Sequence, residues 1–311
     1  MKLVDRLQRW ITEPPPDHLF EITETALATV SPRTPNQSKH EILTERALEP
    51  SPAAPNVLQP QLYRQALTKL SPNPLKRTAA VVIPDYAVRM AILDFEEFPA
   101  GEEERMALLR FRLRKTVPFH IEGAQLAYSI QVDDAKQVEV LAVAIARPIL
   151  DEYESIFTEA GYRVGLVTPS SLASLWLCAR QLQGIWRLAP SLQTELTLLA
   201  KAAGSTLSVL LLEQSRLRLV RSLDFEGSDD EMGRDGRNVL PLLQQTLAYA
   251  EDQIGESVGR LLLCGFGTDT EALGKLAQGE FGVPYAQVRS RFGVAVQENA
   301  GLLGLLEQYA A

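Results

Sequence analysis

The region from Pro84 to Ala146 constrains the fold of this 311-residue chain more than any other part of the sequence. An extended run ends at Phe98, and the consecutive acids Glu102–Glu104 then begin an amphipathic helix, because the helix dipole favours negative charge at that end. The helix continues into the basic run Arg110–Lys115 and ends before Val117–Phe119. Two runs with alternating apolar residues follow, Leu126–Ile130 and Val138–Ala144. The pattern predicts a strand, a helix and two further strands in succession.

Composition excludes several functional classes. The 31 basic and 39 acidic residues give a net charge of −8, which disfavours nucleic-acid binding. Cys178 and Cys264 lie in apolar runs and are interpreted as buried, reduced thiols. Three histidines without a Cys/His cluster argue against a zinc site. We find no apolar run of membrane-spanning length and no signal peptide, so we expect a cytoplasmic protein.

The first residues form a separate amphipathic segment. Lys2–Ile11 places its apolar residues on one helical face, with basic residues elsewhere, and Pro14–Pro16 ends the segment. One interpretation is a helix that lies on a membrane surface through residues 2–11, although so short a helix binds lipid only marginally. The other is a helix docked on its own domain, or a loose terminus. Both stay open.

The remaining chain alternates strands and helices in two similar blocks. This arrangement predicts two packed sheets with helices on their faces. The expected strands are 19–30 as a hairpin, 79–83, 196–199, 207–212, 216–223, 260–264 and 283–286. The expected helices are 61–70, 170–183, 238–254, 270–278 and 299–309.

The order of elements in 84–146 closely resembles the inserted subdomain of PilM proteins of type IV pilus assembly, which are relatives of FtsA in the actin-like ATPase superfamily. The helix Asn299–Leu306 resembles the family helix A-x-A-L-G-L-A-L, which returns to the first domain. The resemblance implies an α/β, actin-like ATPase (RNase H-like) fold with two domains, each a mixed sheet with flanking helices. It also implies a PilM-type insert and a reduced second-domain insertion. The implied bounds are 1–16 for the N-terminal helix and linker, 17–190 for the first domain, about 96–165 for the insert, 191–295 for the second domain and 296–311 for the returning helix.

The first phosphate-binding hairpin of the family aligns with Leu19–Val30 but has lost its chemistry. Such hairpins bind phosphate through backbone N–H groups held close together by glycine. Here Glu21 stands in place of the family aspartate, Thr23 replaces the glycine, and Glu24 adds a negative charge beside Thr25. Ala28 replaces the lysine. Each change works against binding a polyphosphate.

The second phosphate hairpin is degenerate as well. Lys201 replaces an aspartate that lies near the metal, and Ala203 replaces a glycine, while Gly204 and Ser205 remain. A lysine at that position repels Mg²⁺. We expect Lys201 to pair with Glu24; the alternative is that Lys201 binds an anion in place of the metal.

The third motif, the adenosine loop, keeps Gly265 and Gly267, but Phe266 is expected to project near the base pocket. A G-x-G pattern alone is weak evidence for a ligand loop. The connection Asp224–Arg237, expected to be an acidic flexible loop, replaces a longer family subdomain that touches the nucleoside. The resemblance therefore implies a protein with no cofactor, no metal and no small-molecule substrate.

By resemblance, the partner is a PilN-like single-pass inner-membrane protein, whose cytoplasmic tail binds in a groove between the first domain and the insert. The predicted contact residues are basic, aromatic or proline: Arg110, Phe111, Arg114, Pro118 and Phe119. The other interpretation of this basic stretch is a solvated helix face. The implied function is a cytoplasmic scaffold, peripheral at the inner membrane, of the pilus assembly platform.

Two alternatives remain. A nucleotide-binding actin-like ATPase is supported by fold alone, and fold does not fix function. A GspL-like type II secretion scaffold normally continues into a membrane span, which is not seen in this sequence. No Ser/His/Asp, Cys/His or metal constellation indicates a conventional enzyme.

Overall fold

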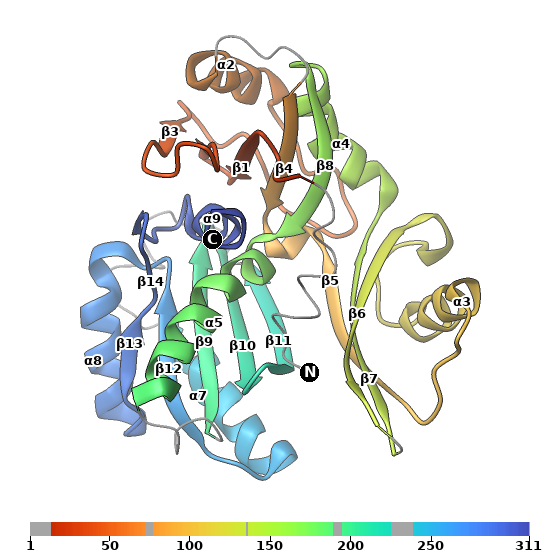
Figure 1. Cartoon of the computed structure of the whole chain (residues 1–311), viewed down its shortest axis with the longest axis vertical. Coiled ribbons are helices and arrows are strands. Elements are labelled where there is room, and N and C mark those ends of the chain that lie inside the picture. Colours follow the sequence, from red (N-terminus) through yellow and green to blue (C-terminus); the bar gives the residue numbers. More distant parts are fainter. Residues whose placement is uncertain (1–13, 72–76, 135, 189–194, 225–238, 311) are drawn as a thin grey trace.

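The computed structural model describes residues 14–71, 77–134, 136–188, 195–224 and 239–310, and within these it contains two five-stranded mixed sheets and a smaller three-stranded one (Figure 1). The first sheet has the order β3-β2-β1-β4-β8. Its strands are β1 (His18–Ile22), β2 (Ala26–Val30), β3 (Lys39–Ile42), β4 (Arg77–Ile83) and β8 (Tyr162–Pro169). The first three strands are antiparallel, and β4 and β8 continue in parallel with β1.

The second sheet repeats this topology with the order β11-β10-β9-β12-β13. Its strands are β9 (Leu196–Ala203), β10 (Thr206–Glu213), β11 (Arg216–Asp224), β12 (Val258–Cys264) and β13 (Tyr285–Gln287). Here too a three-stranded antiparallel meander is followed by two strands parallel to its first member. A short pair, β14 (Arg289–Ser290) with β15 (Gly293–Val294), follows the second sheet.

Helices cover both faces of each sheet. In the first block α2 (Pro60–Leu70) and α4 (Arg147–Thr158) pack on the outer face of the sheet around Phe20, Tyr63 and Tyr153. In the second block α7 (Val239–Tyr249), with the π-helical turn Ala250–Ile254, and α8 (Thr270–Phe281) pack around residues such as Leu211 and Leu263.

The helices α5 (Ser170–Leu188) and α9 (Ala300–Tyr309) lie between the two sheets (Figure 1). One apolar core contains residues from both helices and from both sheets, including Val82, Leu177, Leu210 and Leu303. Burial of apolar area is the dominant stabilising term in folding. The two blocks are therefore joined by a shared core.

The smaller sheet forms the insert beside the two blocks. Its order is β5-β7-β6, from β5 (Arg89–Phe95), β6 (Gln125–Asp133) and β7 (Val138–Ile145). The helix α3 (Glu102–Leu113) covers one face, around Leu109, Leu113 and Val140. The other face of the sheet meets β11, where Arg216 donates to both carboxylate oxygens of Glu139, at 2.7 and 2.5 Å.

The expected elements occur within the described residues, but β3, α4, β8 and the pair β14–β15 were not predicted. β3 was missed, because its sequence Lys-His-Glu-Ile is polar and mostly exposed. The bounds expected for the insert, about 96–165, also differ from the observed elements: its sheet spans 89–145, while α4 and β8 belong to the first block. The reason is that β5 pairs with β7, whereas the apolar face of α4 packs beside Phe20 in the first block.

Several predictions fall outside the described residues. These are the N-terminal helix 2–11, nearly all of the connection 224–237 and the domain boundary at 190/191. Among the described residues, no helix has both the length and the apolar character needed to cross a membrane.

Candidate functional site

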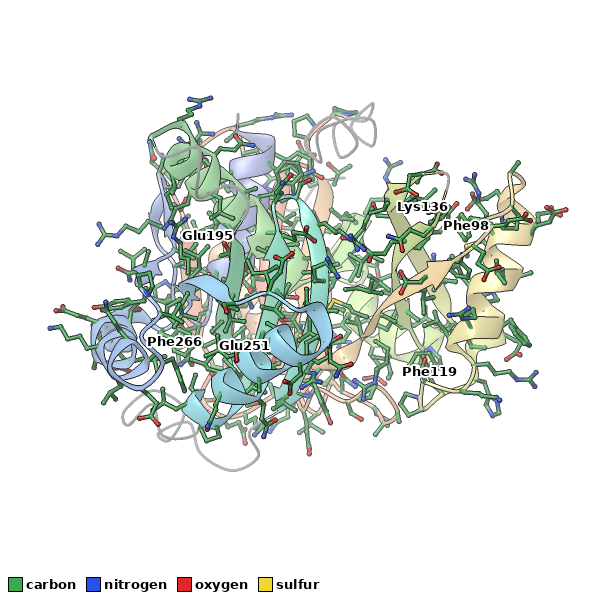
Figure 2. The ribbon with its side chains drawn as sticks, turned by 90° about the horizontal axis from the view of Figure 1, so that it is seen from below. Phe98, Phe119, Lys136, Glu195, Glu251 and Phe266 are labelled. Carbon is green, nitrogen blue, oxygen red and sulfur yellow. The ribbon has the colours of Figure 1, made fainter. Side chains whose placement is uncertain are left out.

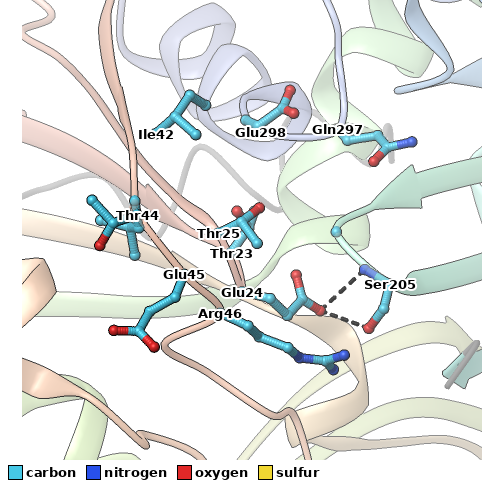
Figure 3. A pocket seen from close by; sticks show the side chains of 12 residues that line it. Thr23, Glu24, Thr25, Ile42, Thr44, Glu45, Arg46, Ser205, Gln297 and Glu298 are labelled. Atoms are coloured by element: carbon cyan, nitrogen blue, oxygen red, sulfur yellow. Dashed lines mark hydrogen bonds between the residues drawn. The ribbon is translucent and has the colours of Figure 1, made fainter. Parts of the chain in front are cut away.

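The two degenerate hairpins meet at a pocket of about 400 Å³ between the two blocks (Figure 3). The turn between β1 and β2 contributes Thr23, Glu24 and Thr25, and the turn between β9 and β10 contributes Gly204 and Ser205. The segment after β3 and the segment before α9 complete the walls. The structure thus brings together the two hairpins that sequence analysis singled out separately.

Glu24 fills the space where the hairpins approach. The backbone N and the hydroxyl of Ser205 donate to Glu24 Oε1, at 3.1 and 2.8 Å. Gly204 has a positive φ of 53°, and a Cβ there would lie 1.5 Å from Glu24 Oε2. The backbone N–H of Ser205, which a phosphate-binding turn would offer to a phosphate, is therefore already hydrogen-bonded to an acidic side chain. The negative charge of that side chain also repels an anion.

Lys201 lies deeper, on β9, and pairs with Asp85 instead of Glu24. Its Nζ is 3.8 Å from Asp85 Oδ2, and neither side chain is more than 1% exposed. Asp85 follows β4 and also accepts hydrogen bonds from the backbone N of Ser171 (2.8 Å) and the hydroxyl of Ser208 (2.7 Å). The expected pairing of Lys201 with Glu24 is therefore wrong. Lys201 is also fully buried, so an external anion, which was the alternative partner, cannot reach it.

Glu21 completes this buried cluster from β1. Its Oε1 accepts a hydrogen bond from the Ser170 hydroxyl at the start of α5, and its Oε2 accepts one from the backbone N of Leu302 in α9, at 2.8 Å. The cluster Glu21, Asp85 and Lys201 thus links both sheets to both central helices. Sequence analysis did not identify Asp85. The feature that could have indicated it is a single acidic residue directly after the apolar run 79–84.

Burial controls the protonation of both glutamates. Desolvation raises the pKa of Glu21 above its ordinary value, although the charge of Lys201 opposes the shift. Desolvation also raises the pKa of Glu24, against the hydrogen bonds from Ser205. Burial raises the pKa of the Cys264 thiol to about 12, and Cys178 is buried as well, so neither cysteine is a reactive thiolate.

The remaining hairpin positions are structural. The backbone N of Thr23 donates a hydrogen bond to the Ala26 carbonyl (3.0 Å), and the Thr23 carbonyl accepts one from the Tyr63 hydroxyl (2.6 Å). Ala28 and Ala203 are buried within the sheets. No group of three or more metal-ligating side chains occurs in the described part of the chain.

In the third motif, Gly265 has a positive φ of 86°, and a Cβ there would lie 2.1 Å from the Ala202 carbonyl oxygen. This glycine is therefore needed for packing against β9. The expectation for Phe266 is wrong: its ring is 4% exposed and packs inward among the apolar residues of the second block. Gly267 also has a positive φ, of 53°, in the turn that leads to α8.

The predicted partner-binding residues lie on α3 and in the segment after it, where Figure 2 shows Phe119, and α3 itself lies on the side of the insert away from the two blocks (Figure 1). Phe111 is 72% exposed, and Arg114 and Pro118 are exposed as well. Arg110 instead donates to the carbonyls of Ile121 and Ala124, which fastens α3 to the following turn. Phe119 is half-buried against the insert core.

These five residues are not in the walls of the second pocket, which has a volume of about 660 Å³ and lies inside the insert. That pocket is lined by residues of β5, α3 and the β6–β7 turn, including Phe95, Leu108, Arg112 and Lys136. Whether any of the five predicted residues contacts a partner stays a prediction.

Two sheets of repeated topology that share a core with α5 and α9 define the actin-like ATPase fold. Among solved structures, the chain is similar to a chain of a PilM–PilN type IV pilus biogenesis complex, with 19% identity and a TM-score of 0.76, over 96% of this chain and 100% of that one. It also matches a Bacteroides thetaiotaomicron protein with actin-like ATPase fold and unknown function, with 13% identity and a TM-score of 0.50, over 93% and 94% of the two chains.

No protein-family model matches the chain, and a comparison with curated protein sequences finds no significant match. At these identities the similarity to solved structures establishes the fold, and the function has to be argued from the site.

Proposed function

We propose that this chain is a cytoplasmic scaffold of a type IV pilus inner-membrane platform that binds the cytoplasmic tail of a PilN-like membrane protein and hydrolyses no nucleotide. The observation that carries the proposal is the match to a chain of a PilM–PilN complex along 96% of the sequence. That extent includes the insert, which is the part of the fold that resembles PilM by sequence.

The content of the cleft supports the absence of nucleotide hydrolysis. Glu24 accepts a hydrogen bond from the backbone N of Ser205, and the buried ammonium group of Lys201 lies beside Asp85. A polyphosphate would have to displace the Glu24 carboxylate from Ser205 while being repelled by its charge. Mg²⁺ would be repelled by the Lys201 ammonium. We therefore expect no measurable heat on calorimetric titration with ATP and Mg²⁺; a dissociation constant in the micromolar range would refute this part.

The insert surface supports the choice of partner site. Phe111 is a large aromatic side chain left mostly in water, and Arg114 beside it has only a long contact of 3.9 Å to Glu122. Aromatic and arginine side chains are the commonest anchors of protein interfaces. Such a surface suits a short peptide that carries apolar and acidic residues.

The test is the affinity of a PilN-type tail peptide by fluorescence polarisation. Phe111→Ala and Arg114→Ala should each weaken binding, by more than about 1 kcal/mol where the side chain is an anchor. Arg110→Ala is a poorer test because it removes contacts within the insert. Leu276→Ala, on α8, is a matched control because this side chain is 49% exposed on the second block. Unchanged affinity in folded Phe111 and Arg114 variants would place the partner elsewhere.

A further inference from the structure

Four exposed arginines gather beside the second sheet, in a chain whose net charge is −8. Arg180 and Arg187 lie on α5, and Arg289 and Arg291 lie on β14 and in the turn after it. We call these four residues the arginine patch. Arg187 follows Arg180 by about two helical turns, so both lie on the same face of α5. A local excess of positive charge on an acidic protein indicates a surface that attracts an anionic partner.

Contacts bring α5 and β14 together, so the four side chains share one surface. Arg180 and Arg291 both pair with Glu307 Oε2 of α9, the second through its Nε at 3.0 Å. The backbone N of Arg289 donates to the side chain of Gln181 on α5, at 3.2 Å. In Figure 1, β14 accordingly lies beside α5.

Glu307 does not cancel the charge of the patch. Its side chain is 3% exposed, so it lies beneath the guanidinium groups with which it pairs. Arg187 and Arg289 are exposed, and within the described ranges no ion pair or hydrogen bond engages their guanidinium groups. These two cations are therefore available to an anion outside the protein.

Apolar side chains lie among the arginines. Val294 is 61% exposed and is the cross-strand partner of Arg289 in the β14–β15 pair, so both side chains point to the same face. Trp176 is half-buried on α5 and precedes Arg180 by one helical turn on the same face. Anionic lipid surfaces bind this combination, because cations meet the phosphate groups while valine and tryptophan enter the headgroup region.

We propose that the arginine patch is a contact surface for a membrane that contains anionic phospholipids. A soluble acidic polypeptide would also be attracted by the cations, but it would gain little from Val294 and Trp176. The proposal goes beyond the scaffold function, and the patch shares no residue with α3. Loss of lipid binding and loss of tail-peptide binding can therefore be told apart.

The test is co-sedimentation of the full chain with two kinds of vesicle: phosphatidylglycerol mixed with phosphatidylcholine at about 1:2, and phosphatidylcholine alone. We expect binding to the mixed vesicles to be tighter by about tenfold or more, and to weaken when salt is raised from about 0.05 M to about 0.5 M. Residues 2–11 are the same in every sample, so their own contribution to lipid binding stays constant.

The variant Arg187→Gln/Arg289→Gln removes two charges without breaking a contact of the described residues, and should weaken binding to the mixed vesicles by about tenfold or more. Arg163→Gln is the control. This exposed arginine lies near the start of β8, whose other end leads into α5, so its loss should have little effect. Val294→Ser tests the apolar part of the surface and should weaken binding severalfold. Circular dichroism checks that each variant is folded.

Equal binding to both kinds of vesicle, or an affinity for the mixed vesicles that the double variant leaves unchanged, would overturn the proposal. A loss as large in Arg163→Gln as in the double variant would also overturn it, because binding would then depend on net charge alone. If soluble poly-L-glutamate displaces the protein from the vesicles and Val294→Ser has no effect, the patch binds an acidic polypeptide and the lipid assignment is wrong.

Discussion

Lys201 Nζ lies 3.8 Å from Asp85 Oδ2, and this buried contact joins β9 of the second block to the end of β4 in the first. Glu21 lies close enough for the same ammonium to influence its protonation. An internal cation thus connects the two halves beneath the two hairpins. The charge arrangement is part of the folded chain and needs no ligand.

Replacing Lys201 with methionine should destabilise the protein strongly. The variant leaves the buried Asp85 carboxylate without its cation, and breaking one side of a buried ion pair costs about 3–5 kcal/mol. Urea unfolding followed by circular dichroism measures the loss. The double variant Lys201→Met/Asp85→Asn should recover part of it, because no unpaired charge remains at that pair. A single variant as stable as the parent protein would contradict the assignment.

Stability should fall as pH rises above 4.5, partly through Glu21. Its pKa is raised from an ordinary value of 4.5, so the folded state binds a proton more tightly than the unfolded state. This contribution is fully present below pH 4.5 and is lost as pH rises through the folded pKa, at up to about 1.4 kcal/mol per pH unit. Glu21→Gln should flatten the stability curve, and Glu280→Gln should leave it unchanged. Parallel curves for Glu21→Gln and the parent would show that Glu21 is not the source.

Gly304 should not tolerate a side chain. A Cβ at this position of α9 would lie 2.0 Å from the Ala173 carbonyl oxygen in α5, so Gly304→Ala has to push the central helices apart. We expect destabilisation of about 1–3 kcal/mol or more, measured as a lower midpoint of urea unfolding. Gly279→Ala is the matched control, because a Cβ on that residue of α8 meets nothing within 4 Å. The control should stabilise the helix by about 0.5–1 kcal/mol.

The contact between Arg216 and Glu139 should hold the insert against the second block. Glu139 is 4% exposed on its side chain, so Arg216→Met leaves a buried, unpaired carboxylate. Hydrogen exchange of the β5–β7 amides should accelerate in this variant, while exchange in β12 and α8 stays the same. The double variant Arg216→Met/Glu139→Gln should restore part of the protection. Equal acceleration throughout the chain would indicate general destabilisation instead.

Most of the fold could be predicted because its strands and helices have strong apolar periodicity. Leu196–Ala203 and Thr206–Glu213 are almost fully buried, and sequence analysis identified the centres of both strands. The polar edge strand β3 lacks that signal. The full extent of the insert depended on which strand pairs with β5, and pairing between residues 43 to 55 positions apart leaves little trace in the local sequence.

For the candidate site, the sequence predicted where the residues lie along the chain but not which residues they contact. The hairpin resemblance located Glu24 and Lys201, but their partners depend on side-chain direction and on a third segment, Asp85. Phe266 was misplaced because the alternation of β12 ends at Gly265: the positive φ of this glycine turns the chain, and the ring of Phe266 packs into the core of the second block instead of lying on the side of Cys264.

The side chain of Gln131 lies at the outer edge of β11, where its amide donates to the Leu217 carbonyl at 3.0 Å and accepts from the Leu217 N–H at 2.8 Å. This amide imitates one residue of a neighbouring strand and uses the groups that an edge strand leaves open for pairing. A second molecule could extend this sheet only by displacing both Gln131 and the insert behind it. Strand addition is therefore opposed at this end of β11, whereas β3 ends the first sheet among the described residues with a mostly exposed, polar strand.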